Sequence, residues 1–272
     1  MPNDPASARY TVQSVAKALR LIDLVAAAPP EGLTLSDIAR QADMSKSAGY
    51  GLVRTLVDAG FLRTIEPGPR YALGLALVRL GDQAGRQLPM SQATDPILQE
   101  LRRETGLTIR LAQIDDGYPV FIQRYDGTGA VRFHAPLGIR ELPHSSAAGK
   151  AILAALPGDE VQRIAAESGL PRHTRKTITD LETLQRDLAL IRQRGYAVDD
   201  EEDVEGVFCV AATFYDHAGR CAGAVSATGI KSDMPAWRVE ELGRTIRSGA
   251  DQVTSLLAGK RLALVNTDPR GA

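Results

Sequence analysis

Polar and cationic side chains recur at helical spacing just beyond residue 44. Lys46, Tyr50 and Arg54 stand four residues apart, which places them on one face of a helix. Such a face suits the major groove of DNA, because its polar side chains reach base edges while its cations meet phosphates. The residues that we expect to contact DNA are Ser45, Lys46, Ser47, Tyr50, Gly51 and Arg54, with Arg63 and Arg70 in a hairpin that follows.

Two short predicted helices within residues 35–62 would position this face. We expect Ser36 to cap the first helix and either Ser45 or Ser47 to cap the second. Asp43 lies in the turn between them, where a left-handed backbone is expected and Asp tolerates it better than most residues. The residues expected to be buried between the helices are Met44, Ala48, Gly49, Leu52, Val53 and Leu56.

A hairpin follows the second helix, which Gly60 is expected to end. Residues 61–65 and 71–73 predict strands on either side of a Pro- and Gly-containing turn at residues 66–70. Two helices and a hairpin in this order are typical of a winged helix-turn-helix. The alternative is a pair of amphipathic helices that merely pack together, and the hairpin favours the DNA-binding interpretation.

Length and charge restrict the class of protein. The chain has 272 residues, 44% of them hydrophobic and 24% charged, which is enough for two domains with ordinary cores. Its net charge is −1, and residues 1–90 contain ten Lys/Arg and eight Asp/Glu. Because neither the chain nor its first part is strongly basic, DNA affinity would depend on where individual cations are placed. No apolar run approaches a membrane span, no signal-peptide core is present, and the two cysteines predict no disulfide framework. These features predict a cytoplasmic protein without a membrane partner.

Periodicity divides the chain into parts. A helix over residues 11–27 would pack under the helix-turn-helix through Val15, Leu19, Ile22 and Val25. We expect a disordered N-terminus at residues 1–10, a DNA-binding domain at 11–74, a linker helix at 75–92, an effector-binding domain at 93–260 and a tail at 261–272.

The second domain alternates helical and strand patterns, which predicts an α+β fold with an antiparallel sheet and helices packed against it. The expected strands are residues 108–114, 120–125, 130–134, 207–215 and 223–228. The expected helices are residues 96–105, 147–156, 159–167, 180–194 and 235–257.

Small residues open the apolar helix near residues 145–150. Free backbone amides at a helix start attract an anion, and small side chains such as those of Ala147 and Ala148 let it approach. A carboxylate ligand would fit there. The alternative is an ordinary serine cap with small residues for close packing.

Other patterns argue against enzyme chemistry. The chain lacks the G-x-S-x-G, H-E-x-x-H and G-x-G-x-x-G motifs, and its four histidines are scattered. The acidic run at residues 199–203 has the composition of a metal site, but a solvated loop is the simpler interpretation. We therefore expect no cofactor and no metal.

Six segments in order resemble the IclR-type family of bacterial transcriptional regulators. Residues 13–25, 34–39, 55–62 and 71–74 are similar to the family's first helix, helix-turn-helix and wing. Residues 142–156 and 194–212 resemble its two effector-domain signatures. The resemblance implies a winged helix-turn-helix joined by a linker helix to a GAF-like α+β effector-binding domain. It also implies that the protein forms homodimers or homotetramers on operator DNA.

The resemblance also implies the residues of an effector pocket for a small organic acid. Asp199, Cys209, Val207, Ser226 and Thr228 match positions that face the effector, and an apolar wall would be made of Ala130, Phe133 and Leu142. Some relatives bind zinc in this domain, for which Cys209 and His144 would be the residues available here.

The recognition helix departs from the family pattern. Ala48, Gly49 and Gly51 stand where β-branched residues and an arginine are usual. Each glycine costs about 1 kcal/mol relative to alanine inside a helix, so we expect a softer helix with weaker DNA affinity. The glycines leave open a second hypothesis, a metabolite-binding dimer with weakened, non-specific DNA binding. A third hypothesis is a small-molecule hydrolase or isomerase built on the sensor domain.

Overall fold

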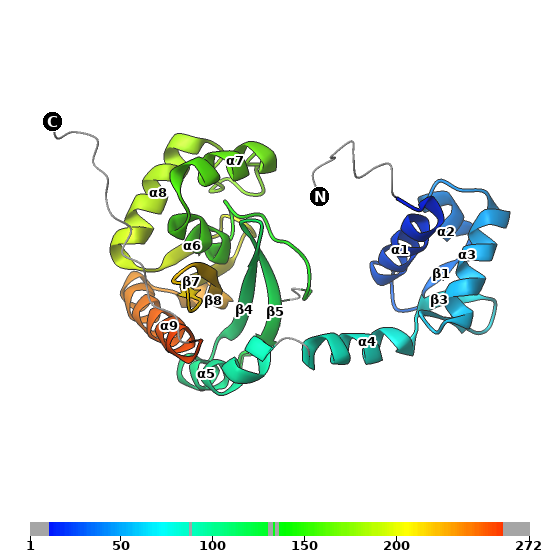
Figure 1. Ribbon diagram of the computed structural model, residues 1–272, viewed down its shortest axis with the longest axis horizontal. Coiled ribbons are helices and arrows are strands. Elements are labelled where there is room, and N and C mark those ends of the chain that lie inside the picture. Colours follow the sequence, from blue (N-terminus) through cyan, green and yellow to red (C-terminus); the bar gives the residue numbers. More distant parts are fainter. Residues whose placement is uncertain (1–10, 87–88, 130–132, 134–135, 258–272) are drawn as a thin grey trace. The chain divides into compact units, whose positions relative to one another are not determined.

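The computed structural model describes residues 11–86, 89–129, 133 and 136–257 (Figure 1). The chain forms two compact units, Met1–Gln87 and Leu88–Ala272, and each is described by itself. The expected N-terminal and C-terminal tails, and Ala130 of the expected pocket wall, lie outside the described residues. No helix within the described ranges is long and apolar enough to cross a membrane.

The first unit is a winged helix-turn-helix, as its sequence predicts. Its elements in order are α1 (Gln13–Ala26), β1 (Leu33–Thr34), α2 (Leu35–Gln41), α3 (Lys46–Asp58), β2 (Leu62–Ile65), β3 (Arg70–Leu73) and α4 (Leu75–Arg86). The strands form an antiparallel sheet in the order β1-β3-β2. The three helices α1, α2 and α3 and this small sheet enclose one core, whose buried members include Leu21, Val25, Ile38, Val53, Leu56, Leu62 and Tyr71.

The turn between α2 and α3 has the predicted backbone, because Asp43 has a φ of 52°. The predicted cap of α2 is wrong. Thr34 rather than Ser36 accepts the bond from the amide of Asp37, at 3.2 Å, because Thr34 ends the short strand β1 and α2 begins directly after it. Ser36 lies inside the helix.

The expected apolar stripe of α1 is only partly correct. Val15 and Leu19 are 55% and 57% exposed, whereas Leu21 is buried together with Val25. The face of α1 that packs on the rest of the core includes Ala18. Because alanine is small and weakly hydrophobic, the apolar pattern of the sequence did not identify this face. Ala48, expected to be buried on α3, is exposed.

The second unit has three layers around a five-stranded antiparallel sheet with strand order β5-β4-β8-β7-β6 (Figure 1). The strands are β4 (Thr108–Asp115), β5 (Tyr118–Tyr125), β6 (Ala197–Asp200), β7 (Val207–Tyr215) and β8 (Cys221–Ile230). One face packs on α5 (Pro89–Thr105) and α9 (Ala236–Leu256), and the other on α6 (Ala147–Ala155), α7 (Gly158–Ser168) and α8 (Leu181–Arg194). The short 3-10 helix η2 (Lys231–Asp233) precedes α9. This is the predicted α+β architecture.

Three details of the second unit differ from the sequence-based expectations. The helix α5 begins at Pro89, seven residues before the predicted start, and keeps Pro96 in its interior. The strand β6 was not predicted, since it has only four residues and two of them are aspartates. Most of the strand expected at residues 130–134 lies outside the described residues, and the described Phe133 is not in a strand.

Candidate functional site

The exposed face of α3 carries the residues predicted to meet DNA. Ser45 caps the helix by accepting a bond from the amide of Ala48 at 3.2 Å, which settles the choice between the two serines. The side chains that follow on this face are all exposed, with Tyr50 50% accessible. Arg54 pairs with Asp58 on the same helix at 3.3 Å, and both side chains are about two-thirds exposed. The exposed members of the face are Lys46, Ser47, Tyr50, Gly51 and Arg54.

The two glycines of α3 occupy different environments. A Cβ on Gly51 would meet no atom within 4 Å, so this position is open on the exposed face. Gly49 is buried, and a Cβ there would lie 3.5 Å from the sulfur of Met44 and 3.6 Å from the Cβ of Ala39. Both are ordinary contact distances, so Gly49 leaves room for a methyl group in the core.

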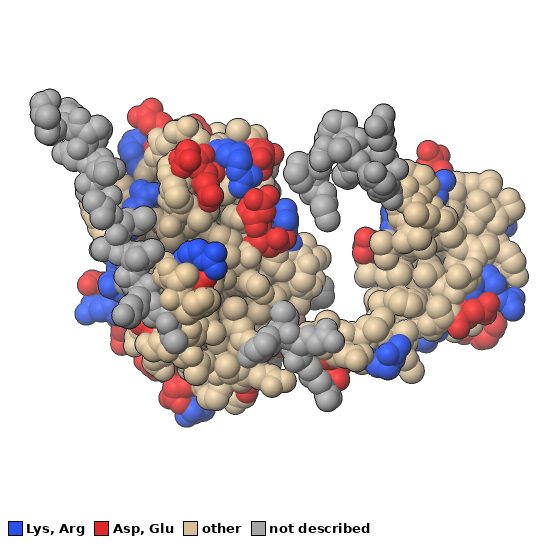
Figure 2. All heavy atoms as spheres, in the orientation of Figure 1, with Lys and Arg blue, Asp and Glu red and all other residues tan. Residues whose placement is uncertain are grey.

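The wing places its two arginines differently. Arg63 is exposed on β2. Arg70 is exposed on β3, but its Nη1 donates to the carbonyl of Gly32 at 3.0 Å and so helps hold the hairpin to the loop before β1. Figure 2 shows basic and acidic side chains interspersed on the visible face, in line with a net charge of −1.

The second unit presents a polar sheet face beneath α6. Thr108, Thr228, Cys209 and Asp199 lie opposite one another on the adjacent strands β4, β8, β7 and β6. The next row contains Arg110 and Ser226 on β4 and β8, followed by alanines on β7 and β6. Directly opposed residues share a face, and Cys209 belongs to the same core cluster as Ala147 and Ala148 of α6. The fold therefore gathers most of the predicted effector residues in one layer.

The start of α6 lies against this face. Ser146 caps the helix, accepting from the amide of Gly149 at 3.2 Å and donating to the carbonyl of Leu142 at 3.1 Å. Ala147 and Ala148 are both 1% exposed. Leu142, Val207 and Phe133 are each half-buried.

Burial sets the protonation of two groups on the sheet. Asp199 is 2% exposed, and desolvation raises its pKa to about 7, although its Oδ1 accepts a bond from the amide of Glu202 at 2.7 Å. Burial also raises the pKa of the Cys209 thiol far above its usual range, so the sulfur is protonated, and it lies 3.4 Å from the Thr228 hydroxyl. This face thus offers hydroxyl, thiol and carboxyl groups that form hydrogen bonds with little net charge.

The acidic run at residues 199–203 is not the solvated loop that we expected. Asp199 and Glu202 are 2% and 8% exposed. Asp199 accepts a bond from the amide of Glu202, and Lys150 of α6 supplies Glu202 with a buried counter-charge. Its Nζ lies 2.5 Å from Glu202 and 2.9 Å from Asp187 of α8. The pairs join the loop, α6 and α8, so this cluster organises the site.

The arrangement does not point to a metal. His144 is buried with its Nε2 3.0 Å from the carbonyl of Pro171, and burial lowers its pKa. Within the described part of the chain, no group of three or more His, Cys, Asp or Glu side chains is placed to hold a metal ion.

Sequence reasoning missed Arg110, which lies on the sheet face that carries the predicted effector residues. Its side chain is 9% exposed, and its Nη1 pairs with Glu141 at 2.8 Å. Side chains alternate between the two faces of a strand, so Arg110 lies on the same face as Thr108 and Ala112. This alternation was the sequence signal that could have identified Arg110.

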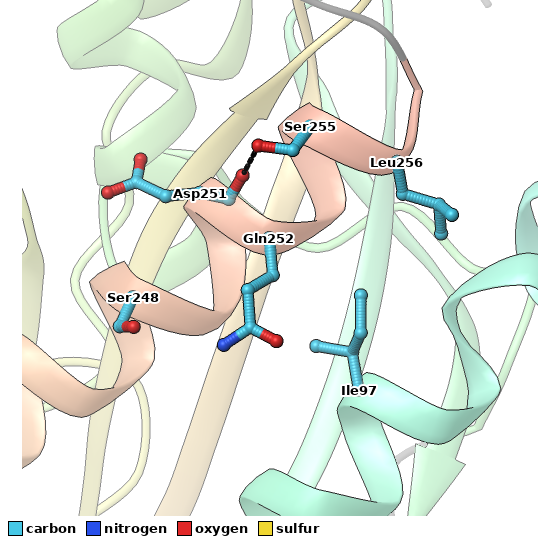
Figure 3. Close-up of a pocket in the computed structure, with 6 residues that line it drawn as sticks. All are labelled: Ile97, Ser248, Asp251, Gln252, Ser255 and Leu256. Carbon is cyan, nitrogen blue, oxygen red and sulfur yellow. Dashed lines mark hydrogen bonds between the residues drawn. The ribbon is translucent and has the colours of Figure 1, made fainter.

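A separate groove lies between α5 and α9, on the other side of the sheet from α6. Its lining residues are Ile97, Ser248, Asp251, Gln252, Ser255 and Leu256, around a volume of about 590 Å³ (Figure 3). Ser255 donates to the backbone carbonyl of Asp251 at 2.9 Å, a bond within α9 itself. The groove contains none of the predicted effector residues.

Both halves of the chain are similar to known proteins. Residues 14–66 match the IclR helix-turn-helix domain, and residues 83–255 match the family described as bacterial transcriptional regulator IclR C-terminal. The transcriptional repressor IclR of Escherichia coli strain K12 is 31% identical over 258 residues, which cover 94% of either chain.

Solved structures share the fold. The crystal structure of IclR from Thermotoga maritima has a TM-score of 0.77 at 29% identity and covers 90% of this chain and 99% of that one. An IclR homologue from Microbacterium hydrocarbonoxydans, in complex with 4-hydroxybenzoate, has a TM-score of 0.76 at 22% identity, over 90% of this chain and 98% of that one. The chain has the helix-turn-helix, the effector-domain fold and the sequence similarity of one family of regulators, not of enzymes. The protein belongs to the IclR family of DNA-binding bacterial transcriptional regulators.

Proposed function

We propose that this regulator binds operator DNA as a homodimer or homotetramer and that a small organic acid, bound beneath α6, controls its operator affinity. In this proposal residues 11–74 bind DNA, residues 75–92 form the linker and residues 93–260 bind the effector. The protein would act in the cytoplasm, where its operator is found. The effector residues are those predicted from the sequence, joined by Arg110.

The polar face of the sheet beneath α6 is the observation that supports effector binding. Buried hydroxyl, thiol and carboxyl groups inside an otherwise apolar layer are typical of a small-ligand site. The Microbacterium homologue holds an aromatic carboxylate, which makes an acid a reasonable class of ligand here. Control of DNA binding requires that the acid bind two arrangements of the protein with different affinity.

The first experiment is a binding titration with DNA from upstream of the gene itself, in a salt series and with random-sequence competitor. We expect specific binding that weakens steeply with salt, because each phosphate contact releases counterions. Failure to bind any upstream fragment at low salt, with and without candidate acids, would refute the regulator proposal for this chain.

Gly49 and Gly51 support a second candidate, a ligand-binding dimer with weakened DNA binding. Both lie inside α3, where glycine lowers the stability of the helix relative to alanine. Sequence-blind binding of equal strength to operator and competitor DNA, alongside normal binding of an acid, would favour this candidate.

A further inference from the structure

Arg110 is a buried cation held on two sides. Its Nη1 lies 2.8 Å from Oε1 of Glu141, and its guanidinium carbon lies 3.7 Å from the centroid of the Phe121 ring. The residue is 7% exposed. A guanidinium clamped between a carboxylate and an aromatic ring has little rotational freedom, so its remaining donors point in fixed directions.

Two buried donors, on the paired residues Arg110 and Ser226, have no partner. Within the described residues, neither Nε of Arg110 nor Oγ of Ser226 makes a hydrogen bond. The two residues are directly paired across β4 and β8 and therefore stand on the same face of the sheet. Native proteins seldom leave buried donors unsatisfied, and two of them on paired residues of one sheet face indicate a missing acceptor.

The other buried cation of this layer is not available to a ligand. Lys150 is 1% exposed and already contacts two carboxylates, those of Glu202 and Asp187. These two carboxylates already exceed its single positive charge, so an added anion would meet net negative charge there. Arg110 has one carboxylate partner, and its planar fork offers a further edge for a second one.

The start of α6 offers only neutral donors. Ser146 already accepts a bond from the amide of Gly149. The remaining backbone amides at the start of the helix carry at most a partial positive charge. A hydrogen bond between a guanidinium and a carboxylate is about twice as strong as one between neutral groups. Arg110 is therefore the group on this face that distinguishes an acid from its neutral amide.

We propose that Arg110 and Ser226 together hold the carboxylate of the effector, with the Arg110 Nε–H and the Ser226 hydroxyl as the two donors, and that Arg110 makes the site selective for acids. This inference rests on the proposed effector function. It places the charged end of the ligand over β4 and β8 rather than at the helix start, with Glu141 keeping its bond to Nη1.

The test uses the full-length protein and calorimetric titration with acetate, succinate, benzoate and 4-hydroxybenzoate, each compared with its neutral amide. Removing Arg110 alone would leave the half-buried Glu141 without its counter-charge, which destabilises the fold. The variant is therefore the double substitution Arg110→Gln/Glu141→Gln, and Arg163→Gln, an exposed arginine on α7, is the matched control.

We expect the double variant to bind the best acid at least tenfold more weakly, while affinity for the matching amide changes less than twofold. The Arg163→Gln control should bind both as the wild type does. Equal affinity of the wild type and the double variant for an acid would overturn this inference and leave the proposed function intact. No binding of any of the acids to the wild type would instead remove the organic-acid effector, and the inference with it.

Ser226→Ala gives a second test that does not depend on a buried charge. The substitution removes an unpartnered hydroxyl, so the ligand-free protein should unfold at the same temperature as the wild type or slightly higher. Its affinity for the acid should nevertheless fall about threefold or more. A variant that loses stability without ligand and keeps its acid affinity would show that Ser226 is structural.

Discussion

Gly49 gives the sharpest test of the idea that α3 is a softened recognition helix. It lies in the interior of α3, and a Cβ there would make ordinary contacts with Met44 and Ala39. Replacing a helical glycine by alanine contributes about 1 kcal/mol, and burial of the added methyl group contributes about 0.8 kcal/mol more. Gly49→Ala should therefore stabilise α3 by between about 1 and 2 kcal/mol.

Hydrogen exchange followed by mass spectrometry would report this change locally. A gain of about 1 to 2 kcal/mol slows exchange of the α3 amides by roughly 5- to 30-fold when exchange occurs through local opening. Gly51→Ala has no new contacts to make, so its effect should be limited to about fivefold. Gly81→Ala, at an open position in α4, is the matched control and should slow exchange in α4 rather than in α3.

DNA affinity is the second readout. Gly49 is buried beneath the surface proposed to face DNA, so its substitution should change binding only through the order of the helix. We expect operator binding up to about fivefold tighter, because less ordering entropy is lost on binding. Unchanged α3 exchange in Gly49→Ala, or equal slowing of α3 in Gly81→Ala, would refute the reasoning.

Three further predictions concern charge. Asp199 has a pKa raised to about 7, so the folded state holds a proton that the unfolded state releases between about pH 4 and 7, and stability falls as pH rises through that window. Asp199→Asn should reduce this fall in urea unfolding followed by circular dichroism, while Glu141 and Glu202, whose pKa values burial also raises, contribute the remainder. A slope equal to that of the wild type would refute the assignment. Lys150→Met should lower the unfolding free energy of the second unit by about 3–5 kcal/mol in the same assay, since two carboxylates lose their counter-charge; a loss below about 1 kcal/mol would contradict the buried network. Lys46→Ala and Arg54→Ala should each weaken DNA binding and reduce the salt slope by about 1 without changing acid binding, whereas equal loss of both activities would indicate misfolding.

Local signals explain why the first unit could be predicted. The turn at Asp43, the cap at Ser45 and the hairpin each depend on residues that are close together in the chain. The cap of α2 could not be chosen in this way, because Thr34 is positioned by pairing of β1 with β3, whose residues lie more than 30 positions further on. Local spacing predicts Ser36 as the cap, since nothing in it indicates where β1 ends.

Long-range pairing explains what was missed in the second unit. Residues 199–203 look like a solvated run until Lys150, about 50 positions earlier, supplies the counter-charge that allows burial. Arg110 is similarly held by Glu141 and Phe121, which come from other parts of the chain. Alternation along a strand tells which face a residue occupies, but it does not tell whether a charged residue on that face has a partner.

The energies available at Arg110 match what regulation by a ligand requires. Leaving a buried donor unsatisfied costs about 1–3 kcal/mol, and the ligand-free site contains two such donors, Nε of Arg110 and Oγ of Ser226. An effector that satisfies both recovers this cost in addition to its other contacts. Coupling between an effector site and a second site is typically about 1–3 kcal/mol. A rearrangement that moved only one of these two donors out of reach of the carboxylate would therefore change effector affinity by enough to couple it to DNA binding.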